Sequence, residues 1–203
     1  FSSRRRHTRY ISVTGVQTCA LPICTIGNLV GIQPDYVFVS RFPFFEDMVN
    51  DIGGITVDNP RYFYDENLKP NGFKAGRIHL TGYGAMAFAR SRHQLLRGDF
   101  DRSADQQLVI RGIQERIRDR AHVPGFIESG VETVMKHLYT DLGPTELFRI
   151  AQAVAQVDPK RITGCVVQGS IGDVNGASIV FPATAMAQRL DRKSTRLNSS
   201  HTD

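Results

Sequence analysis

Arginine and aspartate are concentrated in one stretch of the sequence, residues 88–107, which reads FARSRHQLLRGDFDRSADQQ. The stretch contains four arginines and three aspartates: Arg90, Arg92, Arg97, Arg102, Asp99, Asp101 and Asp105. A guanidinium group is planar and presents its N–H donors in pairs, so it fits phosphate oxygens two at a time. Several arginines on loops beside a helix N-terminus therefore indicate a site for a polyanionic group such as pyrophosphate.

Arg90 and Arg92 lie two residues apart, at the point where a short helix is expected to end. In an extended segment, residues at this spacing point to the same side, whereas in a helix they diverge. An extended chain after the helix would therefore present both guanidinium groups to one ligand.

A structural explanation of the same residues stays open. An Arg- and Asp-rich helix flank is commonly a solvated face, whose surface ion pairs contribute about 0–1 kcal/mol each. Ser103 and Gln106 also fit the capping box S-x-x-Q, which would give Gln106 a purely structural role at a helix N-terminus.

Strand and helix patterns alternate along the chain. Apolar, β-prone runs predict strands at 36–39, 55–57, 161–168 and 176–181. Helical spacing predicts helices at 44–52, 82–89, 103–120, 124–138 and 144–157, and Pro182 is expected to open another. Thr81 is the predicted N-cap of the helix at 82–89, and Asp141 is the predicted cap of the helix at 144–157. Residues 61–76 are rich in turn residues and predict a long loop or an irregular hairpin. The alternation indicates an α/β fold, in which helices cover a sheet.

Both ends of the chain match translated sequencing adapter. Residues 13–23 read VTGVQTCALPI and residues 191–201 read DRKSTRLNSSH, which are translations of the two strands of one short-read adapter. We therefore expect residues 1–23 and 191–203 to be adapter-derived and residues 24–190 to be native, and such segments are excluded from fold reasoning.

The composition of the native part differs from that of the whole chain. The chain has 25 basic and 20 acidic residues, and setting aside the seven basic and two acidic residues of the adapter ends leaves 18 of each. The native part thus gives no charge argument for nucleic acid as a partner. Cys165 is the one securely native cysteine, which excludes an internal disulfide and predicts a small buried apolar residue. No apolar run reaches the roughly 18 residues of a membrane-spanning helix.

The run NGFKAGRIHLTGYGAMAFARSRH, followed by GDFDRSADQQ, resembles the signature of the LytR-CpsA-Psr family. The upstream VNDIGGITVDNP and the downstream spacing from TDLGPTEL to DPKRI agree with it, so the resemblance covers Thr25 to Leu190. It implies a mixed central sheet flanked by helices, with an apolar groove for a lipid tail. It also implies an extracytoplasmic, membrane-anchored phosphotransferase that moves a glycopolymer from polyprenyl-pyrophosphate to peptidoglycan.

The resemblance assigns roles to five residues. Arg90 and Arg92 correspond to the paired arginines that bind the pyrophosphate. Asp99 and Arg102 match a D-x-x-R element at the head group, where Asp99 would orient an arginine or assist proton transfer. Gln106 matches a glutamine that contacts phosphate.

The sequence departs from the family pattern at two places. The family often has a second arginine three residues after Arg102, but this chain has Asp105 there, so Asp105 is not counted as a site residue. The family's aspartates that hold a divalent cation, expected to be Mg²⁺, and an arginine in an S-x-P-R-D-like motif would lie before Thr25. We therefore expect a fragment that is inactive by itself, with the metal ligands and the membrane anchor upstream.

Two other functions stay open for the parent protein: a module that binds polyprenyl-pyrophosphate without chemistry, and a pyrophosphatase that uses water instead of a sugar hydroxyl. Several further residues have a structural explanation as well as a functional one. His93 lies in the ARSRH run but is more commonly an exposed loop histidine, and Asp65 and Glu66 predict a solvated loop rather than a metal site. The aromatic residues Phe42, Phe44 and Phe45 would border a lipid groove or belong to the core.

Overall fold

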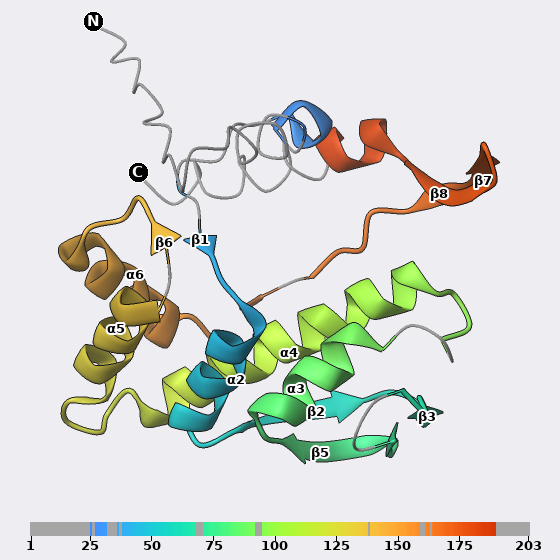
Figure 1. The fold of residues 1–203 in the computed structure, drawn as a ribbon. Coiled ribbons are helices and arrows are strands. Elements are labelled where there is room, and N and C mark those ends of the chain that lie inside the picture. The colour runs from blue at the N-terminus through green and yellow to red at the C-terminus, as the bar shows by residue number, and fades with distance from the viewer. Residues whose placement is uncertain are drawn as a thin grey trace, which may run out of the picture. The chain divides into compact units, whose positions relative to one another are not determined.

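The computed structural model describes residues 25, 27–31, 36, 38–67, 71–91, 95–137, 139–158, 161–162 and 164–189. The chain divides into two compact units, one of residues 38–166 and one formed by residues 1–37 together with 167–203. All the residues that the sequence indicated as a site belong to the unit of residues 38–166 (Figure 1).

The unit of residues 38–166 alternates short strands with helices. In chain order its elements are β1 (Phe38–Val39), α2 (Phe42–Asp51), β2 (Ile55–Asn59), β3 (Phe63–Tyr64), β4 (Gly72–Phe73), β5 (Gly76–Leu80), α3 (Gly82–Arg90), α4 (Asp99–Arg120), α5 (Phe126–His137), β6 (Tyr139–Thr140) and α6 (Pro144–Gln156). The strands described here form antiparallel pairs, β2 with β5, β3 with β4, and β1 with β6. The other unit contains the antiparallel pair of β7 (Gly169–Val174) and β8 (Ala177–Pro182). The predicted α/β class is confirmed.

Helices α3 and α4 lie side by side over the β2–β5 pair (Figure 1). The core between them contains Ile55 and Val57 from β2, Leu80 from β5, Phe88 from α3 and Val109 from α4, all of them buried. Gly112 permits this close approach, because a Cβ atom there would come within 2.8 Å of the Thr56 carbonyl oxygen of β2. The packing fixes the ends of α3 and α4, which carry the polar residues of interest.

Three phenylalanine rings continue the core toward the β3–β4 hairpin. Phe88 stands edge-on to Phe73 at a centroid distance of 5.2 Å, and Phe63 lies 5.3 Å from Phe88. Such tilted and edge-to-face pairs stabilise a core beyond the burial of their area. The hairpin of β3 and β4 confirms the prediction of an irregular hairpin between residues 61 and 76, and it holds the loop that contains Asp65 against α3.

The start of α4 differs from the prediction. The helix begins at Asp99 rather than at Ser103, and its N-cap is Gly98, whose positive φ of 51° favours glycine. Asp99 and Asp101 lie in the first turn, where carboxylates interact favourably with the helix dipole. Ser103 is one turn inside the helix and its hydroxyl donates to the Asp99 carbonyl at 2.9 Å. The predicted capping box of Ser103 and Gln106 is therefore wrong.

The start of α3 was predicted correctly. Thr81 is the N-cap, and its hydroxyl oxygen accepts the backbone N–H of Gly84 at 3.4 Å. For α6 the predicted cap is wrong, because the N-cap residue is Gly143 instead of Asp141.

Three expectations about strands and burial need correction. The described residues between 161 and 168 are not a strand, and the next strand begins only at Gly169. The strand at Phe38–Val39 exists but both residues are exposed, whereas a buried strand was predicted. Cys165 is also exposed rather than buried. Among the described residues no helix is both long and apolar enough to cross a membrane.

Candidate functional site

Arg90 is the last residue of α3 and its side chain is exposed. Its guanidinium carbon lies 4.6 Å from the centroid of the Phe42 ring, a cation–π contact, and its Nη1 lies 3.7 Å from the sulfur of Met86. These contacts fix the Arg90 side chain against Phe42 and Met86. Within the described part of the chain no carboxylate pairs with Arg90. Among the described residues, only the sulfur of Met86 accepts a hydrogen bond from its guanidinium group, so the group can still bind an anion.

Gln106 lies next to this end of α3. Its side-chain Nε2 donates to the carbonyl of Ala89, the residue before Arg90, at 3.3 Å. Arg102 precedes Gln106 by one helical turn and so shares its face of α4. The structure thus brings Gln106 to the end of α3 that carries Arg90, with Arg102 one turn earlier on α4.

Asp99 forms an ion pair with Arg102, with 3.2 Å between Asp99 Oδ1 and Arg102 Nη2. Both side chains are about one-third exposed, so the pair is in contact with solvent. The geometry fits the orienting role for Asp99, because the carboxylate fixes one edge of the guanidinium. Arg92 and His93, the other two candidates from the ARSRH run, lie outside the described residues.

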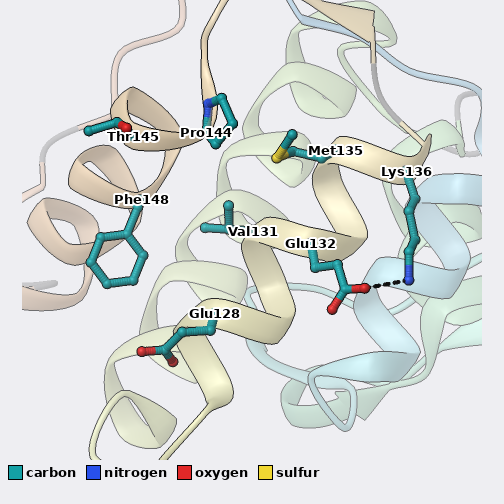
Figure 2. A pocket seen from close by; sticks show the side chains of 8 residues that line it. All are labelled: Glu128, Val131, Glu132, Met135, Lys136, Pro144, Thr145 and Phe148. Carbon is teal, nitrogen blue, oxygen red and sulfur yellow. Dashed lines mark ion pairs between the residues drawn. The ribbon is translucent and has the colours of Figure 1, made fainter.

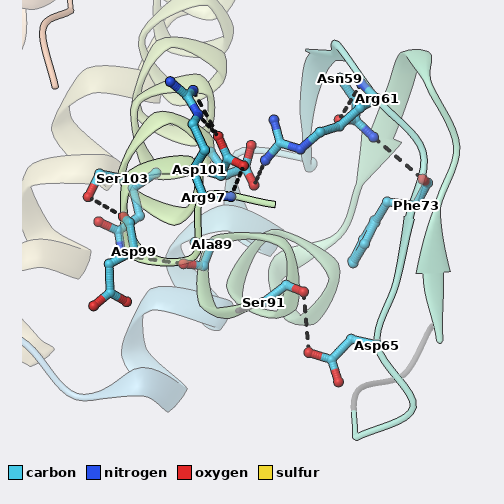
Figure 3. Close-up of polar contacts among 12 residues, drawn as sticks. Asn59, Arg61, Asp65, Phe73, Ala89, Ser91, Arg97, Asp99, Asp101 and Ser103 are labelled. Carbon is cyan, nitrogen blue, oxygen red and sulfur yellow. Dashed lines mark hydrogen bonds and ion pairs between the residues drawn. The ribbon is translucent and has the colours of Figure 1, made fainter. Parts of the chain in front are cut away.

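A second face of α4 carries two buried carboxylates paired with more exposed arginines, a charge network that the sequence did not reveal (Figure 3). Asp101 and Asp105 are one turn apart, and their side chains are 7% and 0% exposed. Arg97 contacts Asp101 with a guanidinium nitrogen at 2.9 Å, and Arg61 contacts Asp105 at 2.7 Å. Sequence spacing could have placed the two aspartates on one helix face, but Arg61 follows β2 far upstream and gives no local signal.

The surroundings shift the pKa values of Asp101 and Asp105 in opposite directions. Burial raises the pKa of Asp105 to about 6, against the opposing effect of Arg61, and one of its oxygens, Oδ1, has no hydrogen-bond partner among the described residues. Burial also acts to raise the pKa of Asp101, but the backbone N–H and side chain of Arg97 and the charge of Arg61 lower the pKa overall. Asp105 was excluded as a site residue, and the structure gives it a structural ion pair.

Asp65 does not lie in a solvated loop as predicted, since it is only 4% exposed. The hydroxyl of the fully buried Ser91 donates to Asp65 Oδ2 at 3.3 Å (Figure 3). Asp65 Oδ1 accepts the backbone N–H of Asn67 at 3.0 Å, a local turn that orients the carboxylate. Glu66 is exposed, as expected.

The described residues do not supply a magnesium site. No group of three or more histidine, cysteine, aspartate or glutamate side chains gathers among them in a way that could hold a metal. The three carboxylates of residues 88–107, Asp99, Asp101 and Asp105, already pair with arginines. The residues present therefore do not fit the cation that the family resemblance implies.

An apolar groove of about 690 Å³ runs between α5 and α6 (Figure 2). Val131 and Met135 line it from α5, and Phe148 lines it from α6. Among the described residues that line it, Lys136 is the one cation, and its ammonium group pairs with Glu132 at 2.7 Å. This groove has apolar character without a free cation, so it is not a phosphate site.

The aromatic residues of α2 do not line this groove. Phe44 is buried, and Phe45 is partly buried against the core. Phe42 is 58% exposed and lies under the guanidinium group of Arg90. The alternative of a core position is therefore confirmed for Phe44.

Comparison with known proteins identifies the family to which this α/β chain belongs. The sequence model described as the LytR_cpsA_psr family matches residues 10–196, and the chain belongs to the LytR-CpsA-Psr family. Among curated proteins, the chain is 30% identical over 151 residues to the polyisoprenyl-teichoic acid–peptidoglycan teichoic acid transferase TagV of Bacillus subtilis, covering 72% of this chain and 38% of the relative. The corresponding transferase TagU of Bacillus anthracis is 29% identical over 128 residues, covering 63% of this chain and 41% of the relative.

Solved structures agree with this assignment. The crystal structure of B. subtilis TagV aligns with a TM-score of 0.72 and 28% identity, covering 89% of this chain and 70% of that one. A LytR-Csp2A-Psr enzyme from Actinomyces oris aligns with a TM-score of 0.62 and 22% identity, covering 80% of this chain and 64% of that one, and supports the fold alone. The chain spans about two-fifths of the length of the curated relatives named above.

Proposed function

We propose that the protein to which this chain belongs is a phosphotransferase that moves a glycopolymer from a polyprenyl-pyrophosphate carrier to peptidoglycan. The observation that carries the proposal is the exposed guanidinium group of Arg90, which has no carboxylate partner among the described residues. It belongs to the end of α3 that Gln106 contacts, and Arg102 lies one turn before Gln106 on α4. The relatives TagV and TagU, named as transferases of teichoic acid to peptidoglycan, support the same reaction class.

The chemistry would be phosphoryl transfer. A peptidoglycan hydroxyl attacks the phosphorus that bears the sugar, a new P–O bond forms, and the bond to the bridging oxygen breaks, releasing polyprenyl phosphate. Such a reaction depends mainly on positioning and on cations that accept negative charge from the phosphoryl oxygens. Arg90 and Arg102 would supply that charge, with Arg92 as the further arginine that the sequence indicates.

The neighbouring polar groups have supporting roles in this proposal. Asp99 would hold Arg102 in place through the ion pair at 3.2 Å, which leaves the other edge of the guanidinium group for phosphate. Gln106 would approach the same ligand, since its amide already contacts the last turn of α3. The hydroxyl proton must pass to a base, and Asp99 is the carboxylate that pairs with Arg102.

Three further features of the proposal rest on the family alone. Mg²⁺ would neutralise charge on the two phosphates, held by residues other than those described here. The protein would act outside the cytoplasm, and a membrane anchor elsewhere in the complete protein would hold it near its lipid-linked substrate. The glycopolymer could belong to any of the wall-polymer classes that the family transfers.

Product analysis tests the proposal. The intact gene is expressed, and the protein is given a lipid-pyrophosphate-linked oligosaccharide with Mg²⁺, with and without a peptidoglycan acceptor. We expect the oligosaccharide phosphate to become attached to peptidoglycan, and chelation of the metal to stop the reaction. Release into water at the same rate in both reactions would identify a pyrophosphatase instead, and binding without turnover would identify a binding module.

A further inference from the structure

A small cavity lies beside α4, where the chain leaves β2. Its volume is about 220 Å³, below the roughly 300–1,000 Å³ of sites for drug-sized ligands, so it has room only for a small ligand. Arg61 lines the cavity from the segment after β2, and Arg111 lines it from α4. All the lining residues belong to the unit of residues 38–166, and none of them is a residue of the proposed phosphate site.

The two arginines give the lining a net positive charge. Arg111 is exposed, and within the described part of the chain it pairs with no carboxylate. Its Nη2 donates to the Ile162 carbonyl at 3.1 Å, which holds the side chain beside the cavity. Arg61 is 30% exposed, and its Nη2 lies 2.7 Å from Asp105 Oδ2. Asp105 therefore balances one of the two positive charges, and the charge of Arg111 stays unbalanced.

The charge and chemistry of the lining fit a carboxylate group. Each guanidinium group presents paired N–H donors, which match the two oxygens of a carboxylate. A carboxylate carries one negative charge, equal to the unbalanced charge of the cavity, whereas a phosphate ester carries about 1.5 to 2. An amine would be repelled by both arginines. Pro60 and Leu108 add apolar surface, which suits the carbon skeleton of a small organic acid.

Asp105 and an external carboxylate would compete for the same arginine. Asp105 is fully buried and Arg61 is partly exposed, so a ligand reaches Arg61 alone of this pair. The charged groups that act on Asp105 among the described residues are Arg61, from the segment after β2, and Asp101, from α4 itself. Asp105 Oδ1 has no hydrogen-bond partner among them, so a proton there breaks no hydrogen bond. Protonation of Asp105 therefore weakens its hold on Arg61 and makes this arginine available to a ligand.

We propose that this cavity binds a small carboxylate through Arg61 and Arg111, and that Asp105 competes with the ligand for Arg61. The inference does not depend on the proposed function, because the residues that would bind pyrophosphate are different ones. A carboxylate of this size is found on an acidic sugar and at the carboxyl end of a peptide, and two probes distinguish these sources.

Binding is tested with glucuronate as the acidic sugar and N-acetylglycine as the peptide end. Each is titrated into the full chain at about pH 5 and constant ionic strength, and the arginine Nε–H signals are followed by NMR, with glucose as the neutral control. We expect saturable binding of at least one carboxylate and none of glucose. Binding of one probe alone identifies the source, and binding of both identifies a general carboxylate site. Equal binding of glucose, or binding of neither carboxylate, would overturn the proposal.

A substitution of Arg111 tests whether the ligand occupies this cavity. Arg111→Gln removes one of its two cations, and Arg118→Gln is the matched control, because Arg118 is an exposed arginine of the same helix outside the cavity. We expect Arg111→Gln to bind the carboxylate about tenfold more weakly and Arg118→Gln to bind as the parent chain does. Far-UV circular dichroism verifies that both variants fold. Equal affinity in all three proteins, or the same loss in both variants, would place the ligand elsewhere and overturn the proposal.

The pH dependence of binding tests the competition by Asp105. Because burial raises the pKa of Asp105 to about 6, its protonated fraction rises from about one-tenth at pH 7 to about nine-tenths at pH 5. The affinity of the parent chain should therefore rise about fivefold to tenfold on acidification, and Arg118→Gln should show the same rise. Asp105→Asn should bind at pH 7 as tightly as the parent chain binds at pH 5. If Asp105→Asn does not fold, the parent chain decides alone, since an affinity that stays constant or falls in acid would overturn the competition.

Discussion

Asp105 is expected to make the protein more stable in mild acid than at neutral pH. Its side chain is fully buried, and burial raises its pKa to about 6 from an ordinary value of 3.8. Between these two pH values the folded protein binds the proton more readily than the unfolded chain does. Stability therefore falls as pH rises through this window and is lowest, for this group, above about pH 6.

The magnitude follows from the two pKa values. Their difference corresponds to on the order of 3 kcal/mol when the whole window is crossed. Between about pH 7 and pH 5, the part reached is about 1 kcal/mol, because the folded group is almost fully protonated at the lower pH while the unfolded group is still ionised. Asp101 does not offset this gain, since its pKa is lowered and it titrates below the window.

The assay is urea unfolding of the parent chain and of Asp105→Asn at the two pH values. The free energy of unfolding should rise on acidification by about 1 kcal/mol more in the parent than in the variant. Because all other titrating groups are shared, the difference isolates Asp105. An equal pH dependence in the two proteins, or a larger loss of stability on acidification in the parent, would refute the reasoning.

A substitution of Arg61 tests the same charge effect in a second way. Arg61→Met leaves Asp105 and Asp101 close together without their shared cation, and breaking a buried pair in this way costs about 3–5 kcal/mol. Acidification should restore part of that loss in Arg61→Met, since protonation of Asp105 removes its unpaired charge. A loss that is the same at both pH values would show that packing, rather than charge, explains the effect.

Other predictions concern the core and the helices. Phe88→Ala should lower the free energy of unfolding by about 3–5 kcal/mol in urea titration, because Phe88 is fully buried between two other rings. Gly82→Ala should destabilise by about 1–3 kcal/mol, since a Cβ atom would collide with the Glu46 carbonyl. Gly130→Ala, in α5 with open space around it, should instead stabilise by about 1 kcal/mol in thermal or chemical unfolding. Stabilisation by Gly82→Ala, or destabilisation by Gly130→Ala, would contradict the packing described here.

Local signals made much of the fold predictable. Thr81 precedes a run of small and apolar residues, and this combination correctly placed the start of α3. The start of α4 was misplaced because Ser103 and Gln106 fit a capping pattern equally well on sequence alone. The deciding feature was Gly98, whose positive φ lets the chain turn into the helix earlier, with Asp99 and Asp101 in the first turn. Such competition between two local patterns is settled by tertiary contacts.

Burial was harder to predict than helical spacing. β5 was missed because the alternation of Ile78 and Leu80 with Arg77 and His79 is too short to stand out, although β2 pairs with all five residues. Conversely, the apolar residues near Cys165 suggested a strand that the structure does not have. In both cases the pairing partner, which lies elsewhere in the sequence, decides the conformation.

The candidate site also has residues whose proximity the sequence motif indicates and others whose proximity it does not. Arg90, Arg102 and Gln106 could be brought together from the motif because they lie at the adjoining ends of two consecutive helices. The pairing of Arg61 with Asp105 could not, because it joins residues 44 positions apart without a local pattern. The role of Arg92 and the adapter origin of the chain ends stay predictions.

The most direct test of the account is whether Arg90 binds pyrophosphate. NMR titration with inorganic pyrophosphate compares the parent chain with Arg90→Gln and with Arg77→Gln, which removes an exposed arginine of β5 as a control. The account predicts that Arg90→Gln lowers the affinity at least about tenfold while Arg77→Gln leaves it unchanged, since one charge-assisted phosphate contact is lost. Equal binding by all three proteins would contradict the assignment of the phosphate site to the end of α3.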